Sequence, residues 1–257
     1  QITQKGIGNG ISLIIFAGIV SAIPSAIGGT IDLVNNGQMN FLVVIAIVVI
    51  IIATVGAIIY VELGERRVPV SYSRKVMMQN QKKRVMNYIP IKVNLSGVIP
   101  AIFASAILMF PATVLQGSQN KYLIMVADYL SPSSYTFNVF MFLFVVFFAF
   151  FYASITFNAK DISENLKKQG GFIPGVRPGA STAEFLNEVA GRLTFWGAIY
   201  MGLISTLPWL IVKAMGVPFY FGGVAVLIVV QVAIDTMRKI EAQQYSNKYQ
   251  TLSAVGL

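Results

Sequence analysis

The sequence predicts an all-α membrane protein, a polytopic bundle of six transmembrane helices with two long cytoplasmic loops. Of its 257 residues, 56% are hydrophobic and only 11% are charged, and the mean hydropathy is +0.71. Soluble proteins carry charge on about a quarter of their residues, and disordered chains are poor in apolar residues. The apolar residues form long blocks rather than alternating with polar ones, which is typical of a chain that crosses a bilayer.

Six apolar blocks are the predicted spans, because a helix needs about 20 residues to cross about 30 Å of hydrocarbon. They lie at about 11–27, 41–61, 95–115, 137–157, 193–212 and 219–234. The first is short and contains Gly18 and Pro24, and the last opens on Gly222 and Gly223. We expect these two spans to pack inside the bundle or to thin the bilayer locally.

The basic residues predict the orientation of the spans. Loop 62–94 carries eight Lys or Arg, loop 158–192 carries five, the tail 238–257 carries three, and Lys5 precedes the first span. Only Lys121 and Lys213 lie on the other side. Because basic loops stay in the cytoplasm, both ends of the chain and both long loops are predicted to be cytoplasmic.

Loop 62–94 is also longer than the 2–8 residues or so that connect neighbouring helices. Within it, residues 68–72 (VPVSY) alternate apolar and polar side chains like a short strand. Long basic loops usually dock a partner, and at a membrane surface ribosomal RNA is a more plausible nucleic acid than DNA. The competing interpretation is that these charges only set the topology and touch lipid phosphates.

The residue types exclude most catalytic chemistry. The chain has no cysteine and no histidine, which excludes disulfides, thiolate nucleophiles, Cys/His zinc sites and a Ser-His triad within it. The predicted spans hold no Asp, Glu, Lys or Arg away from their ends, which disfavours proton coupling and metal catalysis. We therefore predict no catalytic residue, no metal ligand and no cofactor.

Five longer strings carry a family resemblance: KGIGNGISLIIFAGIVSAIPSAI at 5–27, VELGERRVPVSY at 61–72, PIKVNLSGVIPAIFASAILMFPATV at 90–114, ENLKKQGGFIPGVRPG at 164–179 and VPFYFGG at 217–223. Together and in this order they resemble the SecY family, the central subunits of the bacterial protein-conducting channel. The resemblance implies that the chain is the C-terminal half of a ten-span protein, from its fifth to its tenth span. The chain also begins at Gln1 without a basic leader, so we expect no signal peptide and a missing N-terminal half.

The resemblance implies a pore ring of aliphatic side chains that seals the channel against ions, partly by dewetting. By position in the matching strings, its members are Ile15, Ile19, Ile102 and Ile228. Ile15 and Ile19 are four residues apart and lie on one helical face, as a constriction requires. From composition alone, each would be an ordinary lipid-facing or core isoleucine.

The third span resembles the mobile helix of the family's lateral gate. The residues expected at or near its seam are Pro100, Phe103, Ser105, Ala106 and Phe110. Pro100 and Pro111 are expected to interrupt its backbone hydrogen bonds and to let it bend, although prolines also occur in ordinary membrane helices.

The cytoplasmic loops would form the docking surface for the SecA motor or the ribosome. By resemblance the contact residues are Arg66, Arg67, Arg74, Lys75 and Arg177, the last held in a Pro/Gly-rich tight turn at 174–179. The family further implies the partners SecE and SecG, signal sequences and nascent polypeptides as substrates, and a location in the bacterial inner membrane, within the lipid bilayer.

Two other functions remain open from the residues. The chain could be half of a secondary transporter for an apolar or zwitterionic solute, although its charge-free spans and oversized loops disfavour this. It could also be a membrane scaffold without a conduit. The small residues and proline that interrupt the first and last spans disfavour this alternative.

Overall fold

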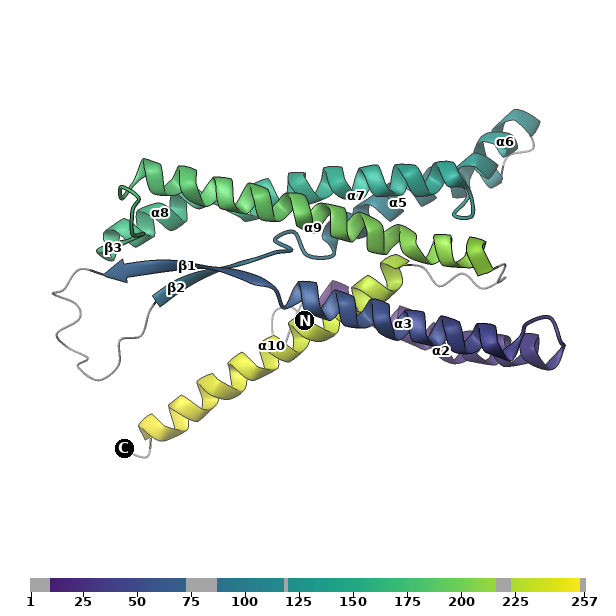
Figure 1. The fold of residues 1–257 in the computed structure, drawn as a ribbon, viewed down its shortest axis with the longest axis horizontal. Helices are drawn as coiled ribbons and strands as arrows, with labels where there is room; N and C mark the ends of the chain where they lie inside the picture. The colour runs from purple at the N-terminus through teal and green to yellow at the C-terminus, as the bar shows by residue number, and fades with distance from the viewer. Residues whose placement is uncertain (1–9, 73–86, 118–119, 216–222, 255–257) are drawn as a thin grey trace. The chain divides into compact units, whose positions relative to one another are not determined.

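The computed structural model describes residues 10–72, 87–117, 120–215 and 223–254, and most of them are helical (Figure 1). The chain divides into two compact units. The first joins Gln1–Ile59 to Ile204–Leu257, and the second is Tyr60–Leu203.

The first unit contains α2 (Gly10–Asn35), α3 (Phe41–Glu62) up to Ile59, the C-terminal part of α9 (Ala180–Met215) and α10 (Gly223–Ala254). A short turn joins α2 to α3, and the side chain of Asn40 accepts a hydrogen bond of 3.1 Å from the amide of Leu42 in the first turn of α3. Helix α10 packs against α2. Gly223 permits α10 to approach α9, because an added Cβ would clash with the carbonyl oxygen of Ile204.

Helix α2 continues to Asn35, well beyond the predicted end at residue 27, with Pro24 inside it. The hydroxyls of Ser21, Ser25 and Thr30 donate to carbonyls three or four residues earlier in the same helix. Membrane helices tolerate proline and glycine, and α2 continues as a helix through Pro24. The segment Ser12–Asn35 is therefore long and apolar enough to cross a bilayer, and the expected shortness of this span is wrong.

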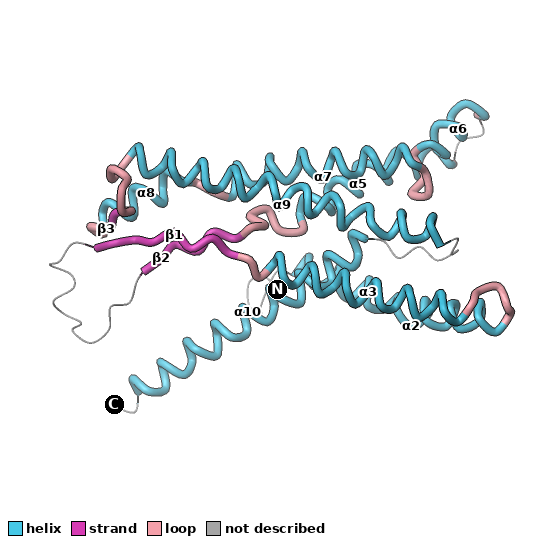
Figure 2. Tube along the Cα trace, viewed as in Figure 1, coloured by secondary structure: helices cyan, strands magenta, loops and turns pink. Residues whose placement is uncertain are grey.

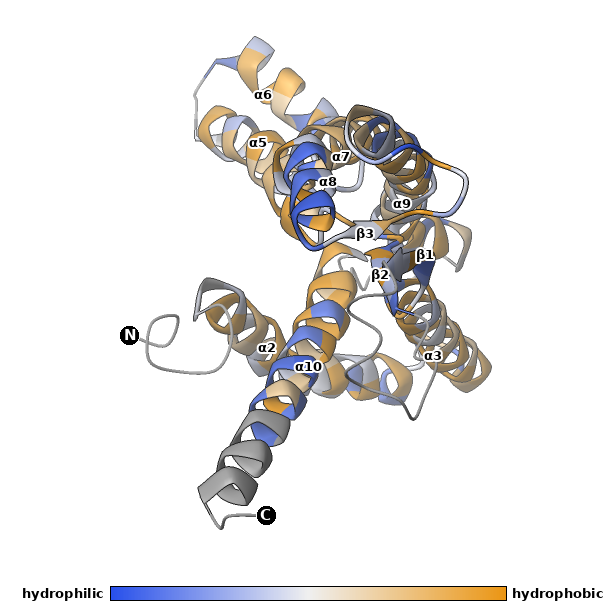
Figure 3. Ribbon diagram, turned by 90° about the vertical axis from the view of Figure 1, so that its left-hand side faces the viewer, coloured by the Kyte–Doolittle hydropathy of each residue, from blue (hydrophilic) through white to orange (hydrophobic). Residues whose placement is uncertain are grey.

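The second unit contains α5 (Ile99–Gln116), α6 (Lys121–Tyr129), α7 (Tyr135–Thr156) and the first part of α9. Helices α5 and α7 pack along each other, and the ring of Phe103 on α5 lies 6.1 Å from Phe148 and 5.9 Å from Tyr152 on α7. Gly202 brings α9 against α7, because a Cβ there would lie 2.6 Å from the ring of Phe142. In Figure 3 the helical parts of α5 and α7 are mostly apolar, whereas α8 (Ala159–Lys168) is largely hydrophilic.

Among the described residues, four helical stretches are long and apolar enough to cross a membrane. They are Ser12–Asn35, Phe41–Glu62, Tyr135–Lys168 and Ala180–Ala214. Helix α5 is apolar but shorter, and the predicted sixth span begins outside the described residues. The chain is thus a multi-pass helical membrane protein, and the count of six spans stays a prediction.

The two predicted loops contain a small sheet as well as helix α8. Strand β1 (Glu65–Tyr72) lies between β2 (Asn87–Lys92) and β3 (Gly171–Phe172), and both neighbours are antiparallel to it (Figure 2). The register pairs Val68 with Ile89 and Ser71 with Phe172. The expected strand at 68–72 is therefore part of a longer strand that ties the two loops together.

Two helices also extend into segments expected to be loop or tail. Helix α9 begins at Ala180 rather than at 193, and α10 continues from the apolar region to Ala254. The first turns of α9 bury Leu186 and Ala190 but expose Glu184 and Glu188. This amphipathic pattern is typical of a helix packed on a water-exposed domain, and it escapes a search for apolar blocks.

Candidate functional site

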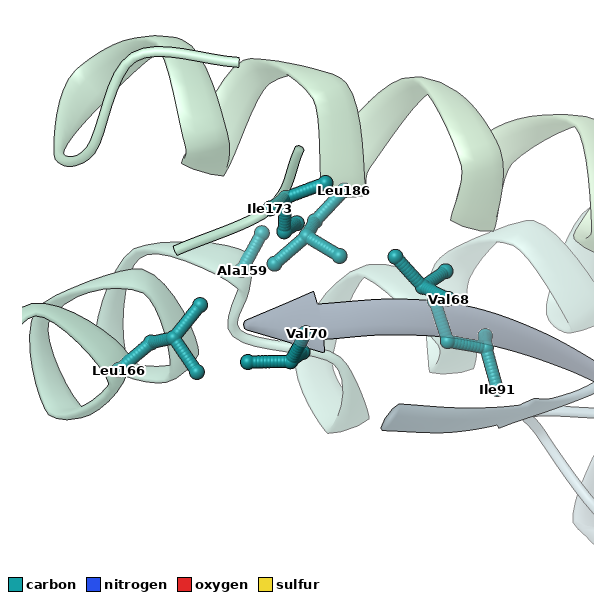
Figure 4. Close-up of a cluster of buried hydrophobic side chains, with 7 residues drawn as sticks. All are labelled: Val68, Val70, Ile91, Ala159, Leu166, Ile173 and Leu186. Carbon is teal, nitrogen blue, oxygen red and sulfur yellow. The ribbon is translucent and has the colours of Figure 1, made fainter. Parts of the chain in front are cut away.

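Residues 65–72, 87–92 and 159–186 form a small domain, which we call the platform. Its apolar core joins β1, β2, α8, the segment after β3 and α9. Figure 4 shows its buried side chains: Val68, Val70, Ile91, Ala159, Leu166, Ile173 and Leu186. Because strands and helices from both loops share this core, the platform has the packing of a folded domain.

Arg177 lies exposed in the turn that leads from Ile173 into α9. Gly175 has φ +84° and Gly179 has φ +106°, backbone conformations that side chains with a Cβ rarely adopt. The Thr182 hydroxyl donates to the carbonyl of Arg177 at 2.8 Å, and the Ser163 hydroxyl of α8 donates to the carbonyl of Gly179 at 2.6 Å. Both hydroxyl residues are buried. The turn is thus fixed on both sides of Arg177, while its guanidinium faces solvent.

The alternation along β1 places Arg66 and Arg67 on opposite faces of the sheet. Arg66 shares its face with Val68 and Val70, which enter the core, and its own side chain is exposed at the edge of that core. Arg67 lies on the solvent face. The two arginines, predicted to act together, therefore point to different surroundings.

Arg67 is held by neighbours within the platform. Its Nε lies 2.7 Å from the Glu65 carboxylate, and its guanidinium carbon lies 4.8 Å above the ring of Tyr88. The hydrogen bond from Arg67 to Glu65 is the largest cause that raises the pKa of Arg67 above its ordinary value. These contacts fix the side chain across the β1–β2 pair. Arg74 and Lys75, also expected at the docking surface, lie outside the described residues.

A buried polar joint connects the platform to the membrane helices. At the cytoplasmic end predicted for α3, Glu62 accepts a hydrogen bond of 2.7 Å from the Asn94 side-chain amide. The side-chain oxygen Oδ1 of Asn94 in turn accepts from the backbone amide of Gly97 at 3.1 Å and from the Ser96 hydroxyl at 3.3 Å, just before α5 begins. Backbones approach closely here, because a Cβ on Gly197 of α9 would lie 2.7 Å from the carbonyl oxygen of Val93.

The four residues expected in the pore ring belong to different units. Ile15 and Ile19 lie one turn apart on α2 and are half-buried, and Ile228 is buried on α10, which packs on α2. Ile102 is half-buried on α5 of the second unit. Their meeting in one ring stays a prediction.

The residues expected at the lateral gate take two positions on α5. Phe103, Ala106 and Phe110 are exposed and recur at spacings of three and four, so they share one face. Ser105 is half-buried and donates to the carbonyl of Ile102 at 2.9 Å. Pro100 is buried in the first turn, where no intrahelical hydrogen bond is lost. The expected interruption at Pro100 is therefore wrong, and Pro111 is the proline inside the helix.

The sequence interpretation did not single out Glu62, Asn94, Ser163 or Thr182 as positioning residues. Asn94 followed by Ser96 and Gly97 is a recognisable turn signal before an apolar helix. The hydrogen bond from Ser163 to Gly179 joins residues that are sixteen apart in the sequence, and no local sequence pattern predicts it.

Comparison with known sequences gives a consistent result. The SecY family model matches residues 1–237. The chain is 69% identical to the protein translocase subunit SecY of Helicobacter pylori over all 257 residues, which is 61% of that protein. It is 41% identical to the subunit of the same name from Escherichia coli over 98% of the chain and 58% of that protein. The chain therefore spans about three fifths of the length of these relatives.

Solved structures agree at the level of the fold. A structure described as that of a protein conducting channel matches 95% of this chain and 61% of its own chain, with a TM-score of 0.69 and 20% identity. A second structure, from work on the plug domain of the SecY protein, also has a TM-score of 0.69 and 20% identity, over 95% of this chain and 62% of its own.

Proposed function

Because the chain belongs to the SecY family, we propose that it forms, together with the remaining part of the protein, a channel for unfolded polypeptides in the bacterial inner membrane. The observation that carries this proposal is the family match over residues 1–237. The relatives are named as protein translocase subunits, and one structural neighbour is described as a protein-conducting channel. Translocated polypeptides would cross the membrane, and hydrophobic segments would leave sideways into the bilayer.

The membrane helices suit a conduit that must pass many side chains without binding them. Ile15, Ile19, Ile102 and Ile228 would form a narrow aliphatic ring that closes around the moving chain and excludes ions when empty. A ring of charges would instead bind oppositely charged residues of the substrate. The chain itself would carry out no chemical reaction.

The exposed face of α5 would be the movable wall of the lateral gate. Phe103, Ala106 and Phe110 share this face and would meet the part of the protein outside this chain. Apolar and small side chains allow a helical signal sequence to slide between two walls without breaking polar contacts.

The platform would be the docking surface, on the cytoplasmic side that the basic loops favour. Arg66 and Arg177 are exposed on a folded domain, and the turn around Arg177 is fixed by Ser163 and Thr182. Because little loop entropy is lost on docking, an arginine on a fixed turn binds carboxylates or phosphates more tightly than one on a mobile loop. The partner would be the SecA motor or the ribosome, which supplies the energy, and SecE and SecG would complete the complex.

Site-specific crosslinking to an arrested precursor tests this function. A photoreactive amino acid is placed at Ile102, and a matched control at Leu143, which is 54% exposed on α7. We expect crosslinks to the precursor at Ile102 and at Ile15, Ile19 and Ile228, but not at Leu143. Equal crosslinking at Ile102 and Leu143 would exclude the proposed path. Solute uptake without any precursor crosslink would favour the transporter alternative.

A further inference from the structure

Helix α6 has an exposed apolar face that neither the channel nor the docking surface uses. Tyr122, Val126 and Tyr129 recur at spacings of four and three, so they lie on one side of the helix. Their exposed fractions are 80%, 47% and 58%. Ala127, by contrast, is fully buried on the side that packs towards α5 and α7. The helix therefore has a packed face and a second apolar face without a partner in the described chain.

The structure holds α6 in place rather than leaving it as a loose connector. The Asn120 side chain caps its first turn by accepting from the amide of Tyr122 at 3.1 Å. After the helix, the buried amide of Asn138 on α7 donates to the carbonyls of Pro132 at 3.0 Å and Ser134 at 2.8 Å. These bonds tie the segment 131–134 to α7. The cap thus stabilises the first turn of α6, and the segment that follows the helix is held on α7.

The neighbouring helices fix the depth of α6. Four residues separate it from α5 and five from α7, and both are apolar helices of a membrane protein. A connection of four residues reaches at most about 14 Å at ~3.5 Å per residue, and each interfacial layer of a bilayer is about 5–8 Å thick. Figure 1 shows α6 beyond the ends of α5 and α7. The start of the helix therefore lies within about 14 Å of the end of α5, near that surface of the membrane.

We propose that α6 is an interfacial helix that lies in the headgroup layer of the bilayer, with Tyr122, Val126 and Tyr129 turned towards the acyl chains. Tyrosine is enriched at this depth because its ring is apolar and its hydroxyl is polar. On α7, which follows α6 in the chain, the apolar side chains of Tyr135 and Val139 are likewise each 60% exposed. Lys121 and Asp128 give the helix no net charge, so apolar burial rather than attraction to anionic lipids holds it there. This inference does not depend on the proposed channel function.

Spin-label accessibility in the full-length protein tests the proposal, since this chain has no cysteine to interfere. Single cysteines are placed at Tyr122 and Val126 on the apolar face and, as the matched control, at the exposed Asp128, with any cysteine elsewhere in the protein replaced. In vesicles of zwitterionic lipid, we expect a several-fold higher ratio of oxygen to nickel-chelate collisions at 122 and 126 than at 128. Equal nickel access at all three positions would overturn the proposal, as would exclusion of both reagents from 122 and 126, which would indicate a protein partner.

A conservative substitution provides a second test, in which no spin label can disturb the packing of α6. In Tyr122→Trp of the full-length protein, the added fluorescence should be quenched by lipids brominated near the headgroup end of the acyl chain, relative to the parent protein without this substitution. Absence of quenching, or quenching that requires anionic lipid, would contradict an apolar interfacial helix.

Discussion

The side-chain amide of Asn94 donates a 2.7 Å hydrogen bond to the buried carboxylate of Glu62. This bond joins the end of α3 to the turn that starts α5, thirty-two residues later in the chain. The platform strands β1 and β2 lie between these two residues in sequence. The bond therefore closes the base of the platform and fixes the direction in which α5 leaves it.

Replacing Asn94 by leucine should destabilise this joint, because the Glu62 carboxylate loses a buried donor. The expected cost is about 1–3 kcal/mol, as for other buried hydrogen bonds to charged groups. Glu62→Gln is the matched control, since its amide oxygen can still accept from Asn94. Thermal unfolding of the full-length protein in detergent measures both variants. A loss for Glu62→Gln as large as that for Asn94→Leu would show that this hydrogen bond is not what stabilises the joint.

Two glycines of α9 provide a second test of the joint. A Cβ on Gly197 would lie 2.7 Å from the Val93 carbonyl oxygen, whereas a Cβ on Gly191 would meet nothing within 4 Å. Gly191→Ala should leave stability unchanged or raise it by up to ~1 kcal/mol, because alanine favours helix. Gly197→Ala should lower the unfolding temperature and loosen β2, measured by amide hydrogen exchange. Equal behaviour of the two variants would contradict the close backbone approach.

Hydropathy correctly predicts a helix when both ends of the helix coincide with the ends of an apolar block. Helices α3 and α7 lie within two residues of the expected ranges for this reason. It fails for α2, where Pro24 and the glycines suggest a break but the helix continues to Asn35. It also fails for the first turns of α9, whose single apolar side packs on the platform.

The platform was only partly predictable. The alternation of apolar and polar side chains at 68–72 correctly indicates a strand, and the prolines and glycines around Arg177 indicate a turn. The partners of that strand and of that turn are distant in sequence: β2, β3 and Ser163. Contacts of this kind depend on the packing of a shared core, which no single stretch of sequence encodes.

Arg66 and Arg67 should respond differently to charge reversal. Arg66→Glu should weaken binding of the cytosolic partner about tenfold, or ~1.4 kcal/mol, with the difference shrinking at high salt. Arg67→Glu should instead loosen the β1–β2 pair, because it removes the contacts with Glu65 and Tyr88. Partner binding at low and high salt and hydrogen exchange of β1 separate the two effects. Loosening of β1 in Arg66→Glu but not in Arg67→Glu would reverse the assignment.

The proposed seal gives a prediction about the resting channel. Asparagine at Ile102 or Ile228 should wet the constriction and let ions leak through the closed channel, with folding intact. Ile107→Asn places the same group on α5 away from the proposed ring and should not leak. Conductance of the full-length channel in planar bilayers measures this. Normal resting conductance in both ring variants would remove these isoleucines from the seal.

Arg177 tests the central claim, that an arginine on a fixed turn of the platform engages the partner that drives transport. Translocation of a preprotein into vesicles is measured for the full-length channel carrying Arg177→Glu, Arg177→Lys or, as a charge-matched control, Lys168→Glu on the same platform. We expect Arg177→Glu to abolish motor-driven transport while the channel stays inserted and assembled. Arg177→Lys should be partly active, because the charge remains but the planar fork of donors is lost, and Lys168→Glu should be close to normal. Transport by Arg177→Glu at the normal rate would contradict the account and place the docking contact elsewhere.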